Sequence, residues 1–154
     1  SNKISLETRK RISQCYVWST LLYGVETWTI TDAMRDRISA FEMWTYRRML
    51  RISWKDKITN EDVLKMVNNQ DRLMRTIQIK KLKYFGHIIR QESLHRSLLD
   101  GKVCGKRGRG RPRARWTTNV CKWTGRPYEE AVRCAQDRLE WRTIASNPLQ
   151  DGTR

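Results

Sequence analysis

Apolar residues recur at helical spacing along most of the chain. Between residues 32 and 52, apolar side chains at Met34, Ile38, Phe41 and Met49 fall on one face of a helix. Similar spacing, with capping residues at the ends, predicts helices over residues 4–23, 32–52, 60–67, 71–91, 113–124 and 128–146. We therefore expect an all-α protein.

Two stretches depart from this pattern. "YGVETWTIT", residues 23–31, alternates like an extended segment, and Thr31 or Asp32 then caps the next helix. "LLDGKV", residues 98–103, is typical of a turn joining two short extended pieces. The predicted organisation is a helical bundle over residues 1–92, a basic Gly/Arg-rich linker or loop over 93–111, and a two-helix C-terminal segment over 112–154.

Some residues inside the predicted helices have two interpretations. Gly86 lies within a helix, where glycine costs about 1 kcal/mol relative to alanine, so it either permits a close backbone contact or is a tolerated irregularity. Trp116 and Trp123 share one helix face with Val120, which favours core packing over base stacking. His87 lies near the apolar face of its helix and is expected to be buried or to contact the backbone.

Charge changes the picture more than composition does. The chain carries a net charge of +16, and residues 72–128 hold sixteen Lys or Arg against only Glu92 and Asp100. That segment therefore carries +14 and the remaining residues carry +2. A bias of this size predicts a phosphate-bearing partner, with nucleic acid ahead of an anionic membrane surface.

The cations form three groups that we predict to contact nucleic acid. They are Lys106, Arg107, Arg109, Arg111, Arg113 and Arg115 in "GKRGRGRPRARW"; Lys80, Lys81, Lys83 and Arg90, mostly off the apolar face of the helix over 71–91; and Arg47, Arg48 and Arg51 at the end of the helix over 32–52. Arginine matches phosphate geometry, and the loop glycines let the backbone approach a strand. We expect these residues to follow a phosphate backbone.

Two other functions remain open at this point. "RGRP", residues 109–112, matches the core of the AT-hook family, which lies in the narrow minor groove of A·T DNA. A DNA-binding adaptor is therefore one alternative, and a basic module that docks an acidic protein is another.

Catalytic chemistry is not evident in the sequence. Two-metal polymerase and nuclease sites need clustered carboxylates, whereas the adjacent acidic pairs at residues 61–62 and 129–130 occupy predicted helix starts. The four cysteines and two histidines show no zinc-ligand spacing. We expect no catalysis by this chain alone, no metal and no cofactor. Without a membrane-length apolar run or a signal-peptide core, we expect an intracellular protein and no membrane partner.

Six blocks together resemble a known family. They are "TLLYGVETWTIT", "ISAFEMWTYRRMLRISWKD", "TNEDVL", "LKYFGHIIR", "GKRGRGRPRARW" and "AQDRLEWR", in this order over roughly residues 15–142. Their order resembles the region after the fingers and palm in reverse transcriptases of non-LTR (LINE-type) retrotransposons, in lineages bearing an apurinic-type endonuclease.

The resemblance implies a thumb-like helical bundle plus C-terminal segment that holds RNA, RNA–DNA hybrid or DNA and accompanies the remaining reverse-transcriptase domains. It also implies a nuclear location. The family's catalytic Tyr-x-Asp-Asp turn, and the Mg²⁺ that it binds, would belong to a palm domain that has no counterpart in this sequence.

Overall fold

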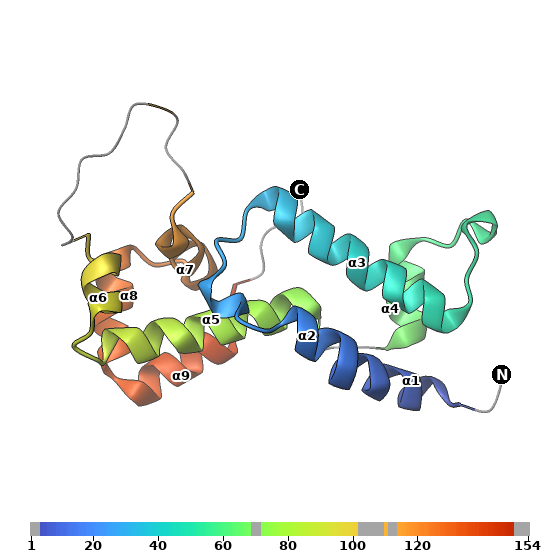
Figure 1. The fold of residues 1–154 in the computed structure, drawn as a ribbon, viewed down its shortest axis with the longest axis horizontal. Helices are drawn as coiled ribbons and strands as arrows, with labels where there is room; N and C mark the ends of the chain where they lie inside the picture. The colour runs from blue at the N-terminus through green and yellow to red at the C-terminus, as the bar shows by residue number, and fades with distance from the viewer. Residues whose placement is uncertain (1–3, 69–71, 102–109, 111–113, 150–154) are drawn as a thin grey trace. The chain divides into compact units, whose positions relative to one another are not determined.

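The protein is all-helical, as the sequence predicts. The computed structural model describes residues 4–68, 72–101, 110 and 114–149 of the 154-residue chain. Within these ranges every regular element is a helix and none is a strand (Figure 1).

The chain divides into two compact units. The first contains Ser1–Val25 and Thr31–Thr76, and the second contains Glu26–Ile30 and Ile77–Arg154. The division falls inside helix α5, Leu73–Ile89, whereas the predicted domain boundaries lie at residues 92 and 111. Those boundaries stay a prediction.

The first unit begins with one continuous helical run. It consists of α1 (Leu6–Ile12), a π-helical stretch (Ser13–Trp18) and α2 (Ser19–Leu21), close to the predicted bounds of 4–23. Helix α3 (Asp32–Leu50) packs against α1 and also against α4 (Asn60–Val67) (Figure 1). Thr31 caps α3 by accepting from the Met34 N–H, so of the two predicted candidates, Thr31 and Asp32, the cap is Thr31. Thr59 caps α4 in the same way by accepting from the Asp62 N–H.

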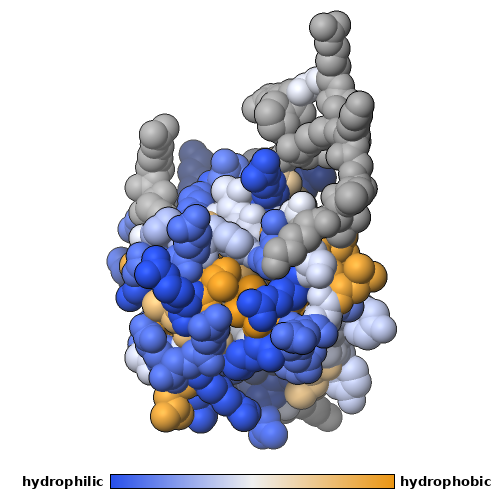
Figure 2. Space-filling model, turned by 90° about the vertical axis from the view of Figure 1, so that its left-hand side faces the viewer, coloured by the Kyte–Doolittle hydropathy of each residue, from blue (hydrophilic) through white to orange (hydrophobic). Residues whose placement is uncertain are grey.

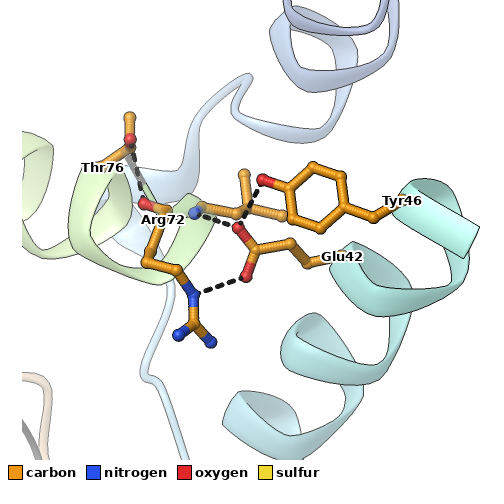
Figure 3. A network of polar contacts seen from close by, with 5 residues as sticks. Glu42, Tyr46, Arg72 and Thr76 are labelled. Atoms are coloured by element: carbon orange, nitrogen blue, oxygen red, sulfur yellow. Dashed lines mark hydrogen bonds and ion pairs between the residues drawn. The ribbon is translucent and has the colours of Figure 1, made fainter. Parts of the chain in front are cut away.

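A buried carboxylate connects α3 to the start of α5 within the first unit. Glu42 is 1% exposed, and its Oε1 accepts from the Leu73 N–H at 2.8 Å and from the Tyr46 hydroxyl at 3.1 Å. Its Oε2 accepts from Arg72 Nε at 3.2 Å (Figure 3). A carboxylate here satisfies a helix N-terminal N–H group and interacts favourably with the helix dipole. Glu42 thus caps α5 from another helix.

The second unit contains most of α5 together with four shorter helices. They are α6 (Leu94–Leu99), α7 (Trp116–Thr124), α8 (Tyr128–Gln136) and α9 (Arg138–Ser146). Helix α8 packs against α7 and α9. The core contains Leu82, Phe85, Val120, Trp123 and Trp141, so the predicted packing role of Trp123 is confirmed.

Three predicted elements of this part of the chain are wrong. Residues 94–99 form helix α6, capped by Ser93, so residues 98–99 of the predicted turn with extended pieces are helical, and residues 102–103 lie outside the described residues. The single helix over 128–146 is two helices, because Asp137 adopts an extended conformation and its carboxylate accepts from the N–H groups of Leu139 and Glu140. The stretch 25–30 contains a 3₁₀ turn at Val25–Thr27 and no strand.

Gly86 permits a close contact between α5 and α9. The Trp141 indole N–H donates to the Leu82 carbonyl at 2.8 Å, which places its ring directly against the helix backbone. A Cβ on Gly86 would lie 2.3 Å from Trp141 Cδ1 and 2.4 Å from Nε1. Of the two interpretations of Gly86, the close backbone contact is therefore correct. His87, next to it, is exposed, so the predicted burial of His87 is wrong.

Candidate nucleic-acid interface

The basic loop holds most of the predicted phosphate contacts. Lys106, Arg107, Arg109, Arg111 and Arg113 lie outside the described residues. Arg115 is described: it is the N-cap residue of α7, its backbone is extended, and its side chain is exposed. The described end of the loop therefore presents a cation to solvent.

Three of the four predicted cations on α5 reach the surface. Lys83 and Arg90 are exposed, and Lys80 is half-buried with its ammonium 3.9 Å from the Glu26 carboxylate. Arg90 also donates to the Ala135 carbonyl at 2.8 Å, which ties the end of α5 to α8. Lys80 and Lys83 line a shallow pocket of about 380 Å³. Of these three cations, Lys80 is engaged by Glu26 and Arg90 by the Ala135 carbonyl.

Hydrophilic side chains dominate the surface at this end of the second unit. Figure 2 shows the face on the side where α6 and α8 lie, and its hydrophobic areas are small and separate. Leu94 and Leu98 on α6 are among the exposed apolar side chains. Asp100, one of the two acids in the basic segment, accepts from the Tyr128 hydroxyl at 2.9 Å and pairs with Arg96 at 4.0 Å. One of the two acidic groups is thus engaged within the protein.

Lys81 is buried, which corrects its predicted surface position. Its side chain has no exposed area, and its ammonium donates to the Trp28 carbonyl at 2.6 Å and to Asn119 Oδ1 at 2.7 Å. It also lies 4.7 Å from the ring centroid of Trp116 and 5.5 Å from that of Trp123. A buried ammonium needs such partners, because its desolvation is otherwise costly. Lys81 therefore has a structural role, and the prediction that it contacts nucleic acid at the surface is wrong.

Asn119 organises the surroundings of Lys81. Its side chain accepts from the Ile30 N–H at 2.9 Å and donates to the Ile30 carbonyl at 2.8 Å. The half-buried Trp116 donates from its indole N–H to the Glu26 carbonyl at 2.8 Å and stacks on Phe85, which supports the predicted packing role. The 26–30 stretch, which forms no sheet, is thus held by side chains of α7. A polar Asn119 on the same helix face as two tryptophans was the signal that a buried polar partner exists.

Burial has a direct electrostatic consequence for Lys81. Loss of hydration lowers the pKa of its ammonium from 10.5 to about 7. The two carbonyl acceptors and the two indole faces act in the opposite direction, since they stabilise the charged form. The loss of hydration outweighs them, so the pKa of Lys81 stays below that of an ordinary lysine.

The three arginines of α3 occupy different environments. Arg47 is half-buried and donates to the Ile58 carbonyl at 3.0 Å, which holds the segment between α3 and α4. Arg48 is exposed, with its guanidinium carbon 5.4 Å from the ring centroid of Trp44. Arg51 ends the helix in a left-handed conformation and is exposed. The predicted group is therefore partly structural and partly at the surface.

The structure adds two tryptophans and a lysine to this group. Trp44, Trp54 and Lys57 line a groove of about 510 Å³ together with Arg47 and Arg48. Trp54 is 85% exposed and Trp44 is 57% exposed. We did not predict this groove, because Trp54 lies in a segment without helical periodicity and Trp44 lies near the apolar stripe of the helix over 32–52. The available signal was that both tryptophans have cations close by in the sequence, Arg47 and Arg48 after Trp44 and Lys55 and Lys57 after Trp54.

The described residues were also compared with the requirements of a metal site. Among these described residues, no group of three or more His, Cys, Asp or Glu side chains lies close enough together to hold a metal ion. Burial raises the pKa of the Cys121 and Cys134 thiols, which keeps them protonated.

Comparisons with known proteins return no match: no family model, curated protein or solved structure is similar to this chain. Among the described helices, none is both long enough and apolar enough to span a bilayer. The functional argument therefore depends on the chemistry of the residues.

Proposed function

We propose that this chain is the non-catalytic nucleic-acid-binding portion of a non-LTR retrotransposon reverse transcriptase, made of its thumb and C-terminal segment. It grips RNA or an RNA–DNA template-primer through the backbone phosphates. The family in this proposal rests on the resemblance of the six sequence blocks, and nucleic-acid binding rests on the concentration of charge, +14 over residues 72–128 against +2 elsewhere. Cationic segments of this kind bind nucleic acid by releasing its condensed counterions.

The described surfaces support this proposal. Lys83, Arg90 and Arg115 are exposed, and Asp100 is engaged by Tyr128 and Arg96. The proposal extends to a nuclear location and to partnership with the remaining reverse-transcriptase domains, whose palm supplies Mg²⁺ and polymerase chemistry.

The loop arginines provide the sharpest test. Substituting Arg107, Arg109, Arg111, Arg113 and Arg115 together by alanine removes about three to five phosphate contacts, at about 0.7 to 0.9 unit of salt slope each. The slope of log affinity against log salt should flatten by about 2 to 4 units. Hybrid, RNA and DNA binding should weaken by similar factors, because phosphate contacts carry little sequence information. An unchanged slope would refute the phosphate grip of the loop.

A panel of equal-length probes separates the alternatives. We expect preference for RNA–DNA hybrid or RNA over duplex DNA. Preference for A-tract duplex, lost when Arg109 and Arg111 alone are changed, would instead identify a DNA-binding adaptor with an AT-hook core. Indifference to every nucleic acid, with binding to polyglutamate, would identify a protein-interaction module.

The chain alone should not extend a primer or cleave a strand. Primer extension with Mg²⁺ or Mn²⁺, and elemental analysis for zinc, check this directly. Turnover that disappears when a residue of this chain is changed, or stoichiometric zinc, would contradict the assignment.

A further inference from the structure

The groove at the C-terminal end of α3 combines two exposed tryptophans with three cations. Its lining includes Trp44, Arg47, Arg48, Ile52, Trp54 and Lys57. A volume of about 510 Å³ falls within the range of about 300 to 1,000 Å³ found for small-ligand sites. We infer that this groove takes unpaired bases of a single-stranded nucleic acid, stacked on Trp54 and Trp44.

Trp54 is held in its exposed position by a rigid local motif. It is the first residue of a 3₁₀ turn, Trp54–Asp56, which Ser53 and Asp56 close as a capping box. The Ser53 N–H donates to Asp56 at 2.7 Å. Because the backbone is fixed, an indole that is 85% exposed is presented to solvent without a burial role. Because folding leaves the Trp54 ring in water, burying its apolar surface against a partner would favour binding.

The second wall of the groove is also preorganised. Trp44 stacks on Phe41 with ring centroids 6.1 Å apart, and the guanidinium carbon of Arg48 lies over the Trp44 ring, 5.4 Å from its centroid. Arg47 connects the two walls by donating to the Ile58 carbonyl at 3.0 Å. An aromatic platform beside a guanidinium is the arrangement that binds a base and its neighbouring phosphate.

Charge selects the class of occupant. No acidic side chain is among the described residues that line the groove, and the neighbouring Asp56 carboxylate is engaged by the Ser53 N–H. An anionic partner with flat aromatic groups satisfies both the cations and the indoles. Bases in a regular duplex are stacked on each other, so only an unpaired strand offers them to Trp54.

This inference rests on the proposed nucleic-acid function but is tested independently of it. Trp54→Ala should weaken binding of a single-stranded oligonucleotide by roughly 5- to 150-fold, the range found for loss of one stacked base. Trp54→Phe keeps an aromatic face and should retain most of the affinity. Duplex binding should change by less than about twofold, because the phosphate contacts elsewhere remain.

Tyr23→Ala is the matched control, since Tyr23 is an aromatic residue of the same unit that is 87% exposed and lies outside the groove. It should leave both affinities unchanged. Thermal unfolding checks that each variant folds. We expect normal folding, because the side chains of Trp54 and Tyr23 are both exposed.

Three results would overturn the inference. They are unchanged single-strand affinity in Trp54→Ala, an equal loss for duplex and single strand, or full competition by polyglutamate, which would identify an acidic protein as occupant. If Trp54→Ala has no effect while the loop variant still loses its salt slope, only the stacking groove fails. If no nucleic acid binds at all, the proposed function fails with it.

Discussion

Gly86→Ala should destabilise the second unit, although alanine is the better helix former. In an isolated helix this change stabilises by about 1 kcal/mol. Here the added Cβ would lie 2.3 and 2.4 Å from two atoms of the Trp141 ring, whereas ordinary van der Waals contact begins at about 3.4 Å. The ring must therefore retreat by about 1 Å in a core that packs like a solid.

The magnitude follows from two costs and one gain. Overpacking a core costs about 1 to 3 kcal/mol. Moving the ring also strains or breaks the 2.8 Å hydrogen bond from the Trp141 indole to the Leu82 carbonyl, and an unsatisfied buried donor costs about 1 to 3 kcal/mol. Set against the gain of about 1 kcal/mol in helix propensity, the expected net loss is about 1 to 5 kcal/mol.

Urea unfolding followed by tryptophan fluorescence measures this loss. His87→Ala is the matched control, because His87 is the exposed neighbour of Gly86 on the same helix, and it should be neutral or stabilising by less than about 0.7 kcal/mol. In a Trp141→Leu background the penalty of Gly86→Ala should shrink or change sign, since the ring that clashes is absent. A Gly86→Ala protein as stable as the unmodified chain would refute the proposed contact.

Two further predictions concern buried charges. The pKa of Lys81 is about 7 in the folded protein, against an ordinary value of 10.5. Between pH 7 and 10.5 the unfolded chain therefore binds more protons than the folded protein. The free energy of unfolding should rise with pH across this range, by at most about 1.4 kcal/mol per pH unit. Lys81→Met should flatten that rise in urea titrations from pH 7 to 10, and identical slopes would contradict the assignment. Glu42→Ala should lower the free energy of unfolding by about 3 to 5 kcal/mol, because the Leu73 N–H and Arg72 lose a buried acceptor. Tyr46→Phe, which removes one hydrogen bond to the same carboxylate, should cost about 1.5 to 3 kcal/mol, and a larger loss than that of Glu42→Ala would rule out the capping role.

Local rules were enough to predict several elements from the sequence. Helices α3 and α4 begin where Thr31 and Thr59 can cap them and follow a continuous apolar face. Even the break at Asp137 has a local signal, since Asp137 followed by Glu140 is a capping-box pattern inside what we interpreted as one helix. These caps act over three residues, so sequence alone can identify the helix starts that they form, whereas the start of α5 is capped by Glu42 from another helix.

The sequence also determined the all-α class and the charge bias on which the proposed function depends. What it could not determine was which charged and aromatic side chains face solvent. Lys81 and Lys83 lie two positions apart on α5, yet Lys81 is buried by partners at Trp28 and Asn119 while Lys83 is exposed. Burial is set by what packs against a helix, and those residues come from distant parts of the chain.

The candidate site shows the same division. The cations of α3 were visible as a run in the sequence, but only the turn at Trp54–Asp56 brings Trp54 to the groove that Trp44 and Arg48 line. Likewise, the need for a glycine at position 86 comes from the ring of Trp141, which lies far along the chain. Periodicity and capping act over a few residues, whereas close packing and charge burial act between segments that only folding brings together, and so the tertiary structure alone decided them.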